Sequence, residues 1–483
     1  MKLKALIRGL EGLEVRGSKE IELTGLSVDS RTVAPGFLFL AKKGSSLDGA
    51  QFIPQALNAG AVAIVTDLYD PSIPVTQVIA KDPGAWEAKL ASRFYGVPSK
   101  ELFVVGTTGT KGKTTSSYMI WHLLRGLGKK AGLISTVETI LGEERRNSTL
   151  TTHGAIHNQK LLREMRSRGV EAVSLEVSSH GLHQGRVDEV EFDVGLFTNL
   201  HPDHLDYHKT VEEYAAAKRL LLRKPLSRAL FNADNSWTSF MREGVSAPSW
   251  TFGIEKPADL RASDLRWDGN GTQFTAEFGG ERASFHLKLM GRFNVYNALG
   301  ATLVGLHLGA KLADIAAILS TFETAPGRLE QVPNERGIWV FVDYAHTGEA
   351  LENVLKTLRE IARKRVICLF GAGGNRDPAR RVQMAKAVEA FADIPIVTSD
   401  NPRNESPETI VREILSGFSD PSKAIVELDR KVAIHRAIEL AEPEDIVLIA
   451  GKGHEKIQIF AHQTIPFDDV AIAKEVLEKQ TTI

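Results

Sequence analysis

Residues 102–124, LFVVGTTGTKGKTTSSYMIWHLL, carry the clearest chemical signal in the sequence. An apolar run leads into closely spaced glycines, which are followed by Lys113, Thr114 and Thr115. Glycines let a backbone approach a phosphate closely, and the amide groups at a helix start attract an anion. The lysine adds a positive charge, and a threonine hydroxyl can bind Mg²⁺. This segment therefore predicts a site for a nucleotide triphosphate.

The segment departs from the usual phosphate loop, G-x-x-x-x-G-K-[ST], because Thr107 occupies the position of the first glycine. Its glycines are instead Gly106, Gly109 and Gly112. The core of the motif suits ATP and GTP equally. The sequence contains no [NT]-K-x-D tetrapeptide that would read guanine, which argues against a GTPase switch.

Further candidate residues follow the loop. Glu176 ends an apolar run, where a carboxylate can hold the Mg²⁺ of a triphosphate directly or through water. The segment HPDHLDYH, residues 201–208, is compatible with a metal site and with a hydrogen-bonded turn. The next helix begins with the capping pair Thr210 and Glu213 and contains Lys218, which by itself reads as a surface residue.

A mostly parallel sheet is expected to position these residues. Apolar runs at 102–106, 171–179 and 193–199 alternate with helical stretches, a pattern typical of a parallel sheet with helices on its faces. Near the C-terminus the pattern recurs, and each apolar run ends in polar, Gly- or Pro-bearing residues. These four runs cover residues 338–346, 365–377, 394–405 and 445–455. The carboxyl ends of such strands gather on one edge, so four polar loops should share one cleft.

Length and composition indicate a multidomain protein. A chain of 483 residues suggests about three domains, and turn-forming residues at 95–101 and 323–333 mark the breaks. We predict domains at 1–98, 99–327 and 328–483. The 59 Lys and Arg balance the 60 Asp and Glu, so no net charge attracts nucleic acid or an anionic membrane.

The N-terminal segment and the single cysteine add two expectations. Charges interrupt the apolar positions of MKLKALIRGLEGLEVRG, which is neither a signal peptide nor a membrane span, so we expect a cytoplasmic protein. Cys368 lies in the apolar run RVICLF and is expected to be a buried structural thiol rather than a nucleophile. We also expect a monomer.

In their order along the chain, these motifs resemble those of the Mur ligases, cytoplasmic ATP-dependent amide ligases of peptidoglycan precursor synthesis. The resemblance runs from about residue 26 to the end. It includes EVSSHGL, DHLDYH with Lys218 fourteen residues beyond His204, GRFNVYNALGA, APGRLE, DYAH and GKGHE. It implies an α/β fold of three domains. These are an N-terminal uridine-nucleotide-binding α/β domain, a central phosphate-loop (P-loop) ATPase-like domain with a mostly parallel sheet, and a C-terminal Rossmann-like α/β domain.

The resemblance also implies roles for individual residues. Catalysis would rest on Lys113, Glu176, His204 and Lys218. ATP would be bound by Gly109, Thr110, Lys111, Gly112, Lys113, Thr114, Thr115, Asn294, Asn297, Arg328 and Asp343. Mg²⁺ would be held by Thr114, Glu176, His204 and Lys218, the last carbamylated by CO₂. The UDP-muramyl dipeptide would be held by Ser30, Ser45, Ser46, Asp48, Thr151, Thr152, Ser178, Gln184 and Arg186. Diaminopimelate would be bound by Arg376, Asp400, Asn401, Pro402, Arg403, Gly451 and Glu455.

DSR at 29–31 and DGAQFIPQAL at 48–57 resemble the family members that add the third peptide residue. Such a member phosphorylates the D-glutamate carboxylate of UDP-MurNAc-L-Ala-D-Glu with ATP, and an amine then attacks the acyl phosphate. The segment SDNPRNESP, residues 399–407, predicts a fixed turn that leaves the Arg403 side chain free to reach a ligand. A guanidinium can grip the second carboxylate of meso-diaminopimelate with two hydrogen bonds. Members that add diaminopimelate have DNPR at this position, whereas members that add lysine commonly lack the arginine. We therefore predict meso-diaminopimelate, with L-lysine as the alternative.

Two other kinds of protein share part of this pattern. A nucleotide-binding regulatory protein would keep the phosphate loop but lose Glu176, His204 and Lys218, and a folylpolyglutamate-synthetase-like enzyme would lack the N-terminal domain and the DNPR turn. Five positions depart from the usual family pattern. They are Lys111 for Asn, His153 for Pro, Gly348 for Pro, Asn375 for Asp and Val382 for Pro.

Overall fold

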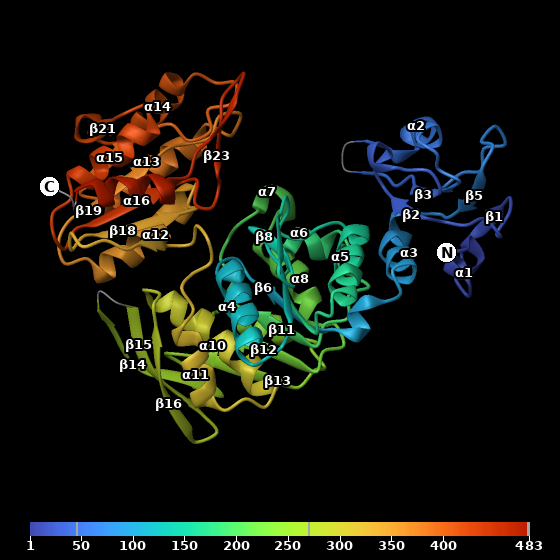
Figure 1. Cartoon of the computed structure of the whole chain (residues 1–483), viewed down its shortest axis with the longest axis horizontal. Helices are drawn as coiled ribbons and strands as arrows, with labels where there is room; N and C mark the ends of the chain where they lie inside the picture. Colours follow the sequence, from blue (N-terminus) through green and yellow to red (C-terminus); the bar gives the residue numbers. More distant parts are fainter. Residues whose placement is uncertain (45–46, 269–270, 481–483) are drawn as a thin grey trace. The chain divides into compact units, whose positions relative to one another are not determined.

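The structure, a computed structural model, describes residues 1–44, 47–268 and 271–480 (Figure 1). The described chain forms two compact units. The first unit comprises Met1–Arg261, Phe278–Gly280 and Asn297–Ile315. The second unit comprises Ala262–Glu277, Glu281–Tyr296 and Ala316–Ile483. The predicted domain boundary at residue 98 falls in the short 3₁₀ helix Pro98–Glu101, and the one at residue 327 lies between the helix Leu312–Ser320 and the strand Glu330–Val332. Both boundaries stay predictions.

The N-terminal part of the first unit is a five-stranded sheet with the order β1-β5-β4-β3-β2. Its strands are β1 (Glu14–Arg16), β2 (Gly25–Ser27), β3 (Phe37–Leu40), β4 (Ala63–Thr66) and β5 (Thr76–Ile79). Its helices are α1 (Leu3–Ile7), α2 (Ile53–Asn58) and α3 (Glu87–Phe94). Leu38 and Leu40 pack into one core and Phe39 into another, because successive strand residues point to opposite faces. Both faces of this sheet are therefore buried.

A larger sheet of eleven strands includes eight strands of the first unit. These eight follow the order β13-β12-β11-β6-β10-β7-β8-β9. They are β6 (Phe103–Thr108), β7 (Ala131–Ile134), β8 (Glu138–Leu141), β9 (Glu144–Asn147), β10 (Ala172–Glu176), β11 (Val194–Phe197), β12 (Arg228–Asn232) and β13 (Ser249–Gly253). Pairing is parallel from β13 to β7 and antiparallel from β7 to β9. The register sets Glu176 directly beside Thr107, so the carboxylate lies next to the phosphate loop.

Helices connect these strands. They are α4 (Lys113–Gly126), α5 (Ala155–Ser167), α6 (Ser179–His183), α7 (Leu205–His208), α8 (Val211–Leu222), α9 (Thr238–Arg242), α10 (Arg292–His307) and α11 (Leu312–Ser320). The predicted capping of α8 is confirmed, because the Glu213 amide donates to Thr210 Oγ1 at 3.1 Å. The strands predicted at 102–106, 171–179 and 193–199 are confirmed as β6, β10 and β11.

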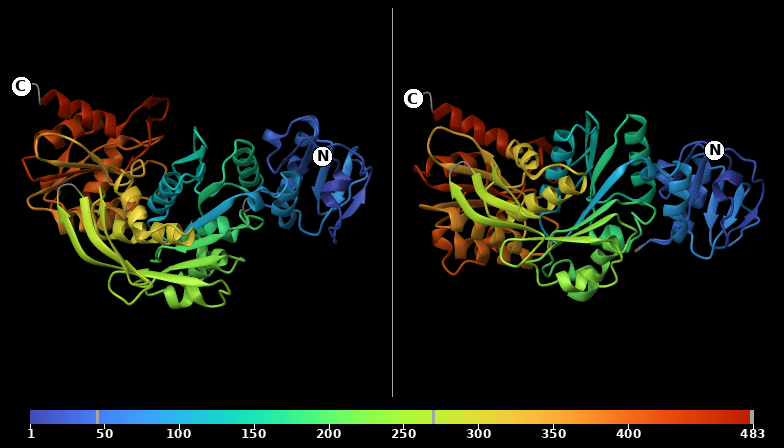
Figure 2. Two further views of the ribbon diagram at one scale, coloured as in Figure 1. Left: turned by 60° about the horizontal axis from the view of Figure 1, so that its bottom comes forward. Right: turned by 90° about the horizontal axis from the view of Figure 1, so that it is seen from below.

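Among the strands of the described chain that were not predicted from the sequence, three follow one another along the chain. They are β14 (Leu260–Asp268), β15 (Gly271–Phe278) and β16 (Glu281–Leu287), which continue the sheet order beyond β13. Figure 2 shows these strands side by side in yellow-green. In β16, exposed polar residues alternate with buried ones such as Phe285 and Leu287, as expected for a sheet with one face exposed to solvent.

The second unit contains a six-stranded sheet with the order β17-β18-β22-β19-β20-β21. Its strands are β17 (Glu330–Val332), β18 (Trp339–Asp343), β19 (Val366–Phe370), β20 (Ile394–Val397), β21 (Ile425–Val426) and β22 (Ile446–Ala450). β17 is antiparallel to β18, and the remaining pairs are parallel. A separate hairpin consists of β23 (Ile457–Ile459) and β24 (Thr464–Pro466). The four apolar runs predicted in this region are confirmed as β18, β19, β20 and β22.

Helices cover both faces of this sheet (Figure 1). They are α12 (Gly348–Ile361), α13 (Ala379–Phe391), α14 (Pro407–Leu415), α15 (Arg430–Glu439) and α16 (Asp469–Gln480). In β19, Val366, Cys368 and Phe370 pack towards α12, α13 and α14, whereas Ile367 and Leu369 pack towards α15 and α16. Cys368 is fully buried, as predicted. The continuous apolar run of each strand follows from this burial on both sides.

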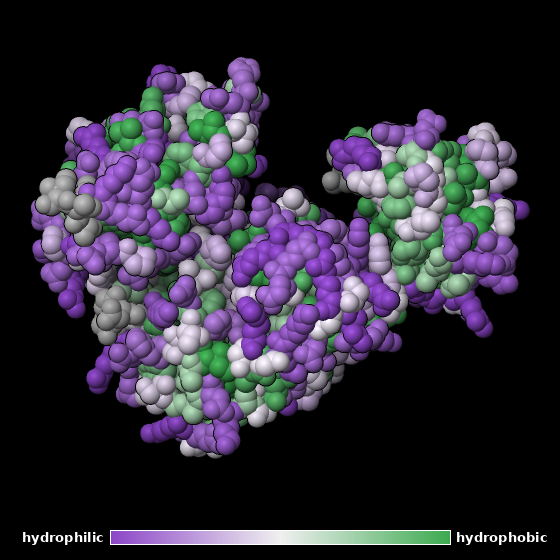
Figure 3. Space-filling model, viewed as in Figure 1, coloured by the Kyte–Doolittle hydropathy of each residue, from purple (hydrophilic) through white to green (hydrophobic). Residues whose placement is uncertain are grey.

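Among the described residues, no helix combines the length and the apolar character that a membrane crossing requires. On the face drawn in Figure 3, hydrophilic residues cover most of the second unit.

Candidate active site

The phosphate loop joins β6 to α4 and depends on two glycines. Gly109 and Gly112 have positive φ angles of 153° and 80°. A Cβ atom at Gly109 would overlap the hydroxyl of Thr198, and one at Gly112 would overlap the side-chain oxygen of Asn297. Only glycine fits at these two positions, because any side chain would collide with Thr198 or Asn297.

Residues that follow β11 fasten the loop from one side. The Thr110 amide donates to the Asn199 carbonyl, and the Lys111 amide donates to Asn199 Oδ1, both at 2.9 Å. Thr198 Oγ1 donates to the Lys111 carbonyl at 2.7 Å. Thr198 and Asn199 were not predicted as site residues. The signal that could have found them is their place at the carboxyl end of a strand that pairs with β6.

Lys113 and Thr114 begin α4 at the end of this loop. Lys113 Nζ donates to the carbonyls of Gly109 and Thr110 at 3.0 and 2.9 Å. Thr114 Oγ1 lies 3.2 Å from both carboxylate oxygens of Glu176. The Thr136 amide also donates to Glu176, at 3.0 Å, and the glutamate is only 1% exposed. The structure thus brings a hydroxyl and a buried carboxylate together beside the loop, as an Mg²⁺ site requires.

Lys218 points inward from α8, which contradicts the reading of this residue as a surface lysine. It is 1% exposed, and its Nζ donates to the Gly109 carbonyl at 2.6 Å. The same Nζ lies 4.4 Å from the centre of the Tyr214 ring. Burial, together with the charge of Lys113, lowers the pKa of Lys218 well below its usual value. Both effects shift the protonation equilibrium of Lys218 towards the neutral amine.

Residues 201–208 form a hydrogen-bonded turn ending in α7. His204 takes a left-handed backbone conformation with φ 54°, and its Nε2 lies 3.7 Å from Asp203. His208 is buried with its Nε2 3.0 Å from Ser179 Oγ, and the Tyr207 hydroxyl lies 2.9 Å from His183 Nδ1. Burial lowers the pKa of His204. The charge of Asp203 raises this pKa, whereas the charges of Lys113 and Lys218 lower it further.

Within residues 1–44, 47–268 and 271–480, no three His, Cys, Asp or Glu side chains are placed to hold a metal ion. A cation near Glu176 would therefore also need oxygen atoms from other residue types, and the Thr114 hydroxyl is one. The oxygen donors of Thr114 and Glu176 suit Mg²⁺, and an oxygen added to Lys218 would be of the same kind. The role of these residues as a metal site stays a prediction.

Four residues predicted to bind the muramyl peptide form one hydrogen-bonded group. Thr152 Oγ1 donates to the Glu176 carbonyl at 3.0 Å and accepts the Ser178 amide at 2.9 Å. Arg186 donates to the Thr152 carbonyl at 2.7 Å and to Gln184 Oε1 at 2.6 Å. This group is therefore tied to the strand that carries Glu176.

The remaining residues predicted for this substrate lie apart in the sequence. Thr151 Oγ1 accepts from Thr136 Oγ1 at 3.0 Å, and Ser30 Oγ donates to Gln55 Oε1 at 2.7 Å. The Asp48 carboxylate accepts the Ala50 amide at 3.0 Å and begins a short helical turn. Ser45 and Ser46 lie outside the described residues.

Four of the residues predicted to bind ATP, Asn294, Asn297, Arg328 and Asp343, are divided between the two units. In the first unit, Asn297 accepts from Ser116 Oγ at 3.1 Å, beside the phosphate loop. In the second unit, Asn294 donates to the Met290 carbonyl at 2.8 Å, and the Arg328 guanidinium lies 5.1 Å from the Tyr344 ring centre. The carboxyl of Asp343 accepts two backbone amides, and burial raises its pKa.

Polar loops in the second unit meet at one edge of the sheet, as predicted. The Gly374 amide donates to the Asn401 carbonyl at 2.9 Å, which joins the loops after β19 and β20. Asn401 Nδ2 donates to Glu455 Oε2 at 2.8 Å, and buried Lys452 donates to Asn401 Oδ1 at 2.9 Å. The loop after β22 is thereby joined to the same cluster. Asp400 is buried beneath it, and burial raises the pKa of its carboxyl.

The predicted turn at Asn401–Pro402–Arg403 is present, but the Arg403 side chain is not free. The φ angle of Arg403 is 52°, and its amide donates to the Ile459 carbonyl at 3.0 Å. Its Nη1 donates to the Gly374 carbonyl at 2.8 Å. Arg376 is exposed on the neighbouring loop. The sequence could not predict the bond to Gly374, because it depends on the packing of two loops.

Three family models match successive parts of the chain. They are described as Mur ligase family, catalytic domain, at residues 22–95; Mur ligase middle domain, at 107–305; and Mur ligase, glutamate ligase domain, at 327–453. A protein from Chlamydia caviae named UDP-N-acetylmuramoyl-L-alanyl-D-glutamate–2,6-diaminopimelate ligase is 43% identical over 482 residues, 99% of each chain. The chain belongs to the Mur ligase family.

Other Mur ligases resemble it over their full length. A relative with the same name from Geobacillus thermodenitrificans is 41% identical and covers 99% of this chain and 100% of its own. A solved structure of a protein with that name is 29% identical, with a TM-score of 0.73, and covers 100% of this chain and 99% of its own. The chain thus has the three-domain α/β fold of the Mur ligases, with mixed, mostly parallel sheets, and it is an ATP-dependent ligase.

The structure explains some departures from the usual Mur ligase pattern. Asn375 has φ 56°, a left-handed conformation that asparagine and aspartate both tolerate, and its Oδ1 accepts the Asn404 amide at 3.2 Å, so the asparagine keeps the local backbone of the usual aspartate. Gly348 begins α12 where an added Cβ would come within 2.7 Å of Gln383 Cβ. Val382 immediately precedes Gln383 in the chain, so these two departures lie close together. Lys111 contributes its backbone to the phosphate loop, and nothing in the structure explains why its side chain is a lysine.

Proposed function

We propose that this Mur ligase uses ATP to join meso-diaminopimelate to the D-glutamate γ-carboxylate of UDP-MurNAc-L-Ala-D-Glu. The observation that carries the proposal is the Arg403 turn, whose guanidinium stands beside the loops containing Arg376 and Glu455. The names of the relatives from Chlamydia caviae and Geobacillus thermodenitrificans support this substrate.

The first chemical step would be phosphoryl transfer. A D-glutamate carboxylate oxygen attacks the γ-phosphorus of ATP, the bond to the bridging oxygen breaks, and ADP leaves. Both reactants are anions, so positioning and charge neutralisation are the main contributions of the protein. The amide groups of residues 109–115 and the Lys113 ammonium suit this role. The amine then attacks the acyl phosphate, phosphate leaves, and the amine loses a proton as the amide forms.

Mg²⁺ would be held by Thr114, Glu176, His204 and Lys218. When bound, the cation neutralises phosphate charge as the γ-phosphoryl group moves. The hydrogen bonds of Glu176 to Thr114 and Thr136 keep the carboxylate oriented before a cation arrives.

Carbamylation would convert Lys218 into an anionic oxygen ligand. The neutral Nζ attacks the carbon of CO₂, an N–C bond forms, and one proton is released to water. Burial favours the neutral amine that this reaction needs, and it disfavours an ammonium that would repel Mg²⁺. The bond from Nζ to the Gly109 carbonyl keeps the amine beside the phosphate loop.

The amino acid would be held at both ends. The bond to Gly374 uses one of the five N–H donors of Arg403, which leaves donors for the distal carboxylate of diaminopimelate. Glu455 would attract the ammonium group. L-lysine lacks the distal carboxylate and would leave the guanidinium incompletely paired, at a cost of about 3 kcal/mol or roughly a hundredfold in kcat/KM.

The muramyl-peptide residues would position the other substrate. Arg186 and Gln184, with Thr151, Thr152 and Ser178, stand on the loops next to Glu176 and suit an anionic, peptide-bearing ligand. We further infer that Ser30, Asp48, Ser45 and Ser46 bind the uridine nucleotide. The enzyme would act as a cytoplasmic monomer of 52.9 kDa.

The deciding experiment measures amide product by mass spectrometry with ATP, Mg²⁺, the UDP-muramyl dipeptide and either amino acid. We expect product and ADP in equal amounts, dependence on all substrates, and a kcat/KM about a hundredfold higher for meso-diaminopimelate than for L-lysine. Equal values, or a preference for lysine, would identify the lysine-adding alternative. Absence of amide product would support a non-catalytic nucleotide-binding protein.

A further inference from the structure

A buried ion pair lies beneath the loops predicted to bind the amino acid. Arg430 begins α15, Asp469 begins α16, and both side chains are 0% exposed. Arg430 Nε donates to Asp469 Oδ1 at 2.9 Å, and Nη2 donates to Oδ2 at 2.7 Å. This two-pronged geometry orients the guanidinium rigidly.

The same guanidinium also contacts the backbone of two strand ends. Its Nη2 donates to the Ala450 carbonyl at 2.9 Å, and its Nη1 donates to the Ser399 carbonyl at 3.3 Å. Ala450 ends β22, and Ser399 follows β20. These strands are not neighbours, because β19 lies between them in the sheet. One side chain therefore joins the bases of two loops on non-adjacent strands, below the direct bonds that Asn401 makes with Glu455 and Lys452.

Those two loops are the ones with predicted ligand-binding residues. Ser399 directly precedes Asp400–Arg403, and Ala450 directly precedes Gly451–Glu455. Gln458, in the strand β23 that follows the second loop, also donates from its Nε2 to the Asp400 carbonyl at 2.8 Å. The spacing of the two loops decides whether groups at both ends of one amino acid can be bound together.

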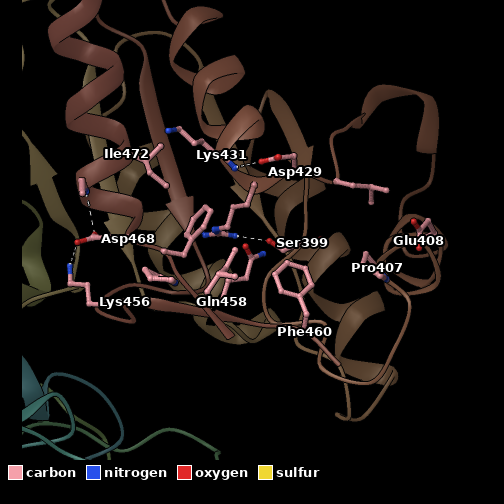
Figure 4. Close-up of a pocket in the computed structure, with 16 residues that line it drawn as sticks. Ser399, Pro407, Glu408, Asp429, Lys431, Lys456, Gln458, Phe460, Asp468 and Ile472 are labelled. Atoms are coloured by element: carbon pink, nitrogen blue, oxygen red, sulfur yellow. Dashed lines mark hydrogen bonds and ion pairs between the residues drawn. The ribbon is translucent and has the colours of Figure 1, made fainter. Parts of the chain in front are cut away.

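A pocket of about 930 Å³ borders this arrangement on one side (Figure 4). Ser399, Gln458 and Phe460 line it together with Arg430. The loop segment at Ser399 therefore borders open space on one side, and the arginine is one of the side chains that support it. A lysine could not replace that support, because it lacks the planar fork that reaches a carboxylate and two carbonyls together.

We propose that Arg430, held by Asp469, is a positioning residue that fixes the spacing between the Asp400–Arg403 turn and the Gly451–Glu455 loop and so sets the affinity for the amino acid. The proposal rests on the proposed function. A buried ion pair adds little to stability compared with apolar residues of similar size, so a role in stability alone does not account for it. Misplacement of a binding group by about 1 Å can cost up to a hundredfold in rate.

The test is the double variant Arg430→Met/Asp469→Leu, which replaces the pair by apolar side chains and removes both carbonyl contacts. Such replacements commonly preserve stability, so the melting temperature should stay close to that of the wild type. We expect the KM for meso-diaminopimelate to rise about tenfold or more and the preference over L-lysine to fall. The KM for the UDP-muramyl dipeptide should change by less than about twofold.

Arg365→Met is the matched control. Arg365 pairs with buried Asp445 at 3.0 Å through Nε, at the opposite, amino-terminal ends of β19 and β22. This variant should lower the melting temperature and leave the KM for meso-diaminopimelate unchanged. A rise in KM seen only in the double variant is then due to the changed spacing of the two loops, and not to the loss of an ion pair elsewhere in this sheet.

Wild-type KM values in the double variant would overturn the proposal, and so would equal rises in KM for both substrates. If the double variant does not fold, Arg430→Lys, which can still pair with Asp469, should show the same selective rise in KM. If the wild type uses a different amino acid, the proposed function fails. The same comparison with that amino acid then decides the role of Arg430.

Discussion

At the scale of single residues, Lys218 offers the most direct test of the chemistry. Lys218→Ala removes the buried nitrogen beside the phosphate loop, and we expect kcat to fall on the order of 10²–10³. Acetate or propionate should restore part of the activity, because each supplies an anionic oxygen for the missing ligand. Initial rates of ADP release, with and without added carboxylate, give the measurement.

Lys224→Ala is the control for that variant. Lys224 follows the same helix, is partly buried, and donates to the Asp188 carbonyl at 2.7 Å. It should keep near-wild-type turnover. Normal activity in Lys218→Ala would show that the lysine serves only the packing of α8.

His153 gives a pH dependence specific to this chain. The residue is 6% exposed, and its Nε2 has no hydrogen-bond partner among the described residues. Burial lowers the pKa of His153 to about 4. Because the unfolded chain binds this proton more readily, stability should fall as the pH drops from 6.5 towards 4. The loss should reach about 2 kcal/mol at pH 4.5.

His153→Pro, which introduces the residue usual in the family, should reduce that loss. Urea unfolding at pH 7 and pH 4.5 measures the difference, and His462→Asn, at an exposed histidine, is the control. An unchanged acid sensitivity in His153→Pro would rule out this origin.

At the scale of elements, the phosphate loop should not tolerate a side chain at Gly112. In Gly112→Ala the new Cβ would overlap Asn297, and we expect the KM for ATP to rise at least about tenfold. Gly128→Ala separates this overlap from backbone strain, because Gly128 has a similar φ of 81° and no atom within 4 Å of the added Cβ. Equal KM values in the two variants would contradict the argument.

The pattern of apolar runs and turns predicted β6, β10 and β11 in the first unit. In the second unit it predicted β18, β19, β20 and β22. It succeeded because both faces of these strands are buried, which forces a continuous apolar run in the sequence. The meeting of their loops at one edge also followed from parallel pairing. The strands β14–β16 were not predicted. They alternate polar and apolar residues instead of forming a continuous apolar run, and they contain no chemical motif.

Side-chain contacts between distant segments could not be predicted from the sequence. Lys218 reads as a helix-surface residue, and only the packing of α8 against β6 turns it inward. Arg403 was expected to be free, but a carbonyl of another loop accepts one of its donors. Arg430 and Asp469 belong to none of the motifs found in the sequence, and their link to Ser399 depends on the packing of α15 and α16 against the sheet.

At the scale of the whole molecule, each ligand should stabilise the unit that holds its predicted residues. meso-Diaminopimelate at about 100 times its Kd should add about 2.7 kcal/mol to the stability of the second unit. Calorimetry of the full chain should show a higher unfolding temperature for that unit, with a smaller shift from L-lysine at the same concentration. An equal shift from both amino acids would contradict the prediction.

The burial of Cys368 has a practical consequence for following that stabilisation. It is the one thiol in the sequence, it lies fully buried in β19, and burial raises its pKa. A thiol reagent can modify it only after the second unit opens, so the modification rate of the native chain records an opening equilibrium. When reclosing is faster than modification, that rate is proportional to the open population. The unmodified protein thus carries its own kinetic probe of amino-acid binding, without any introduced label.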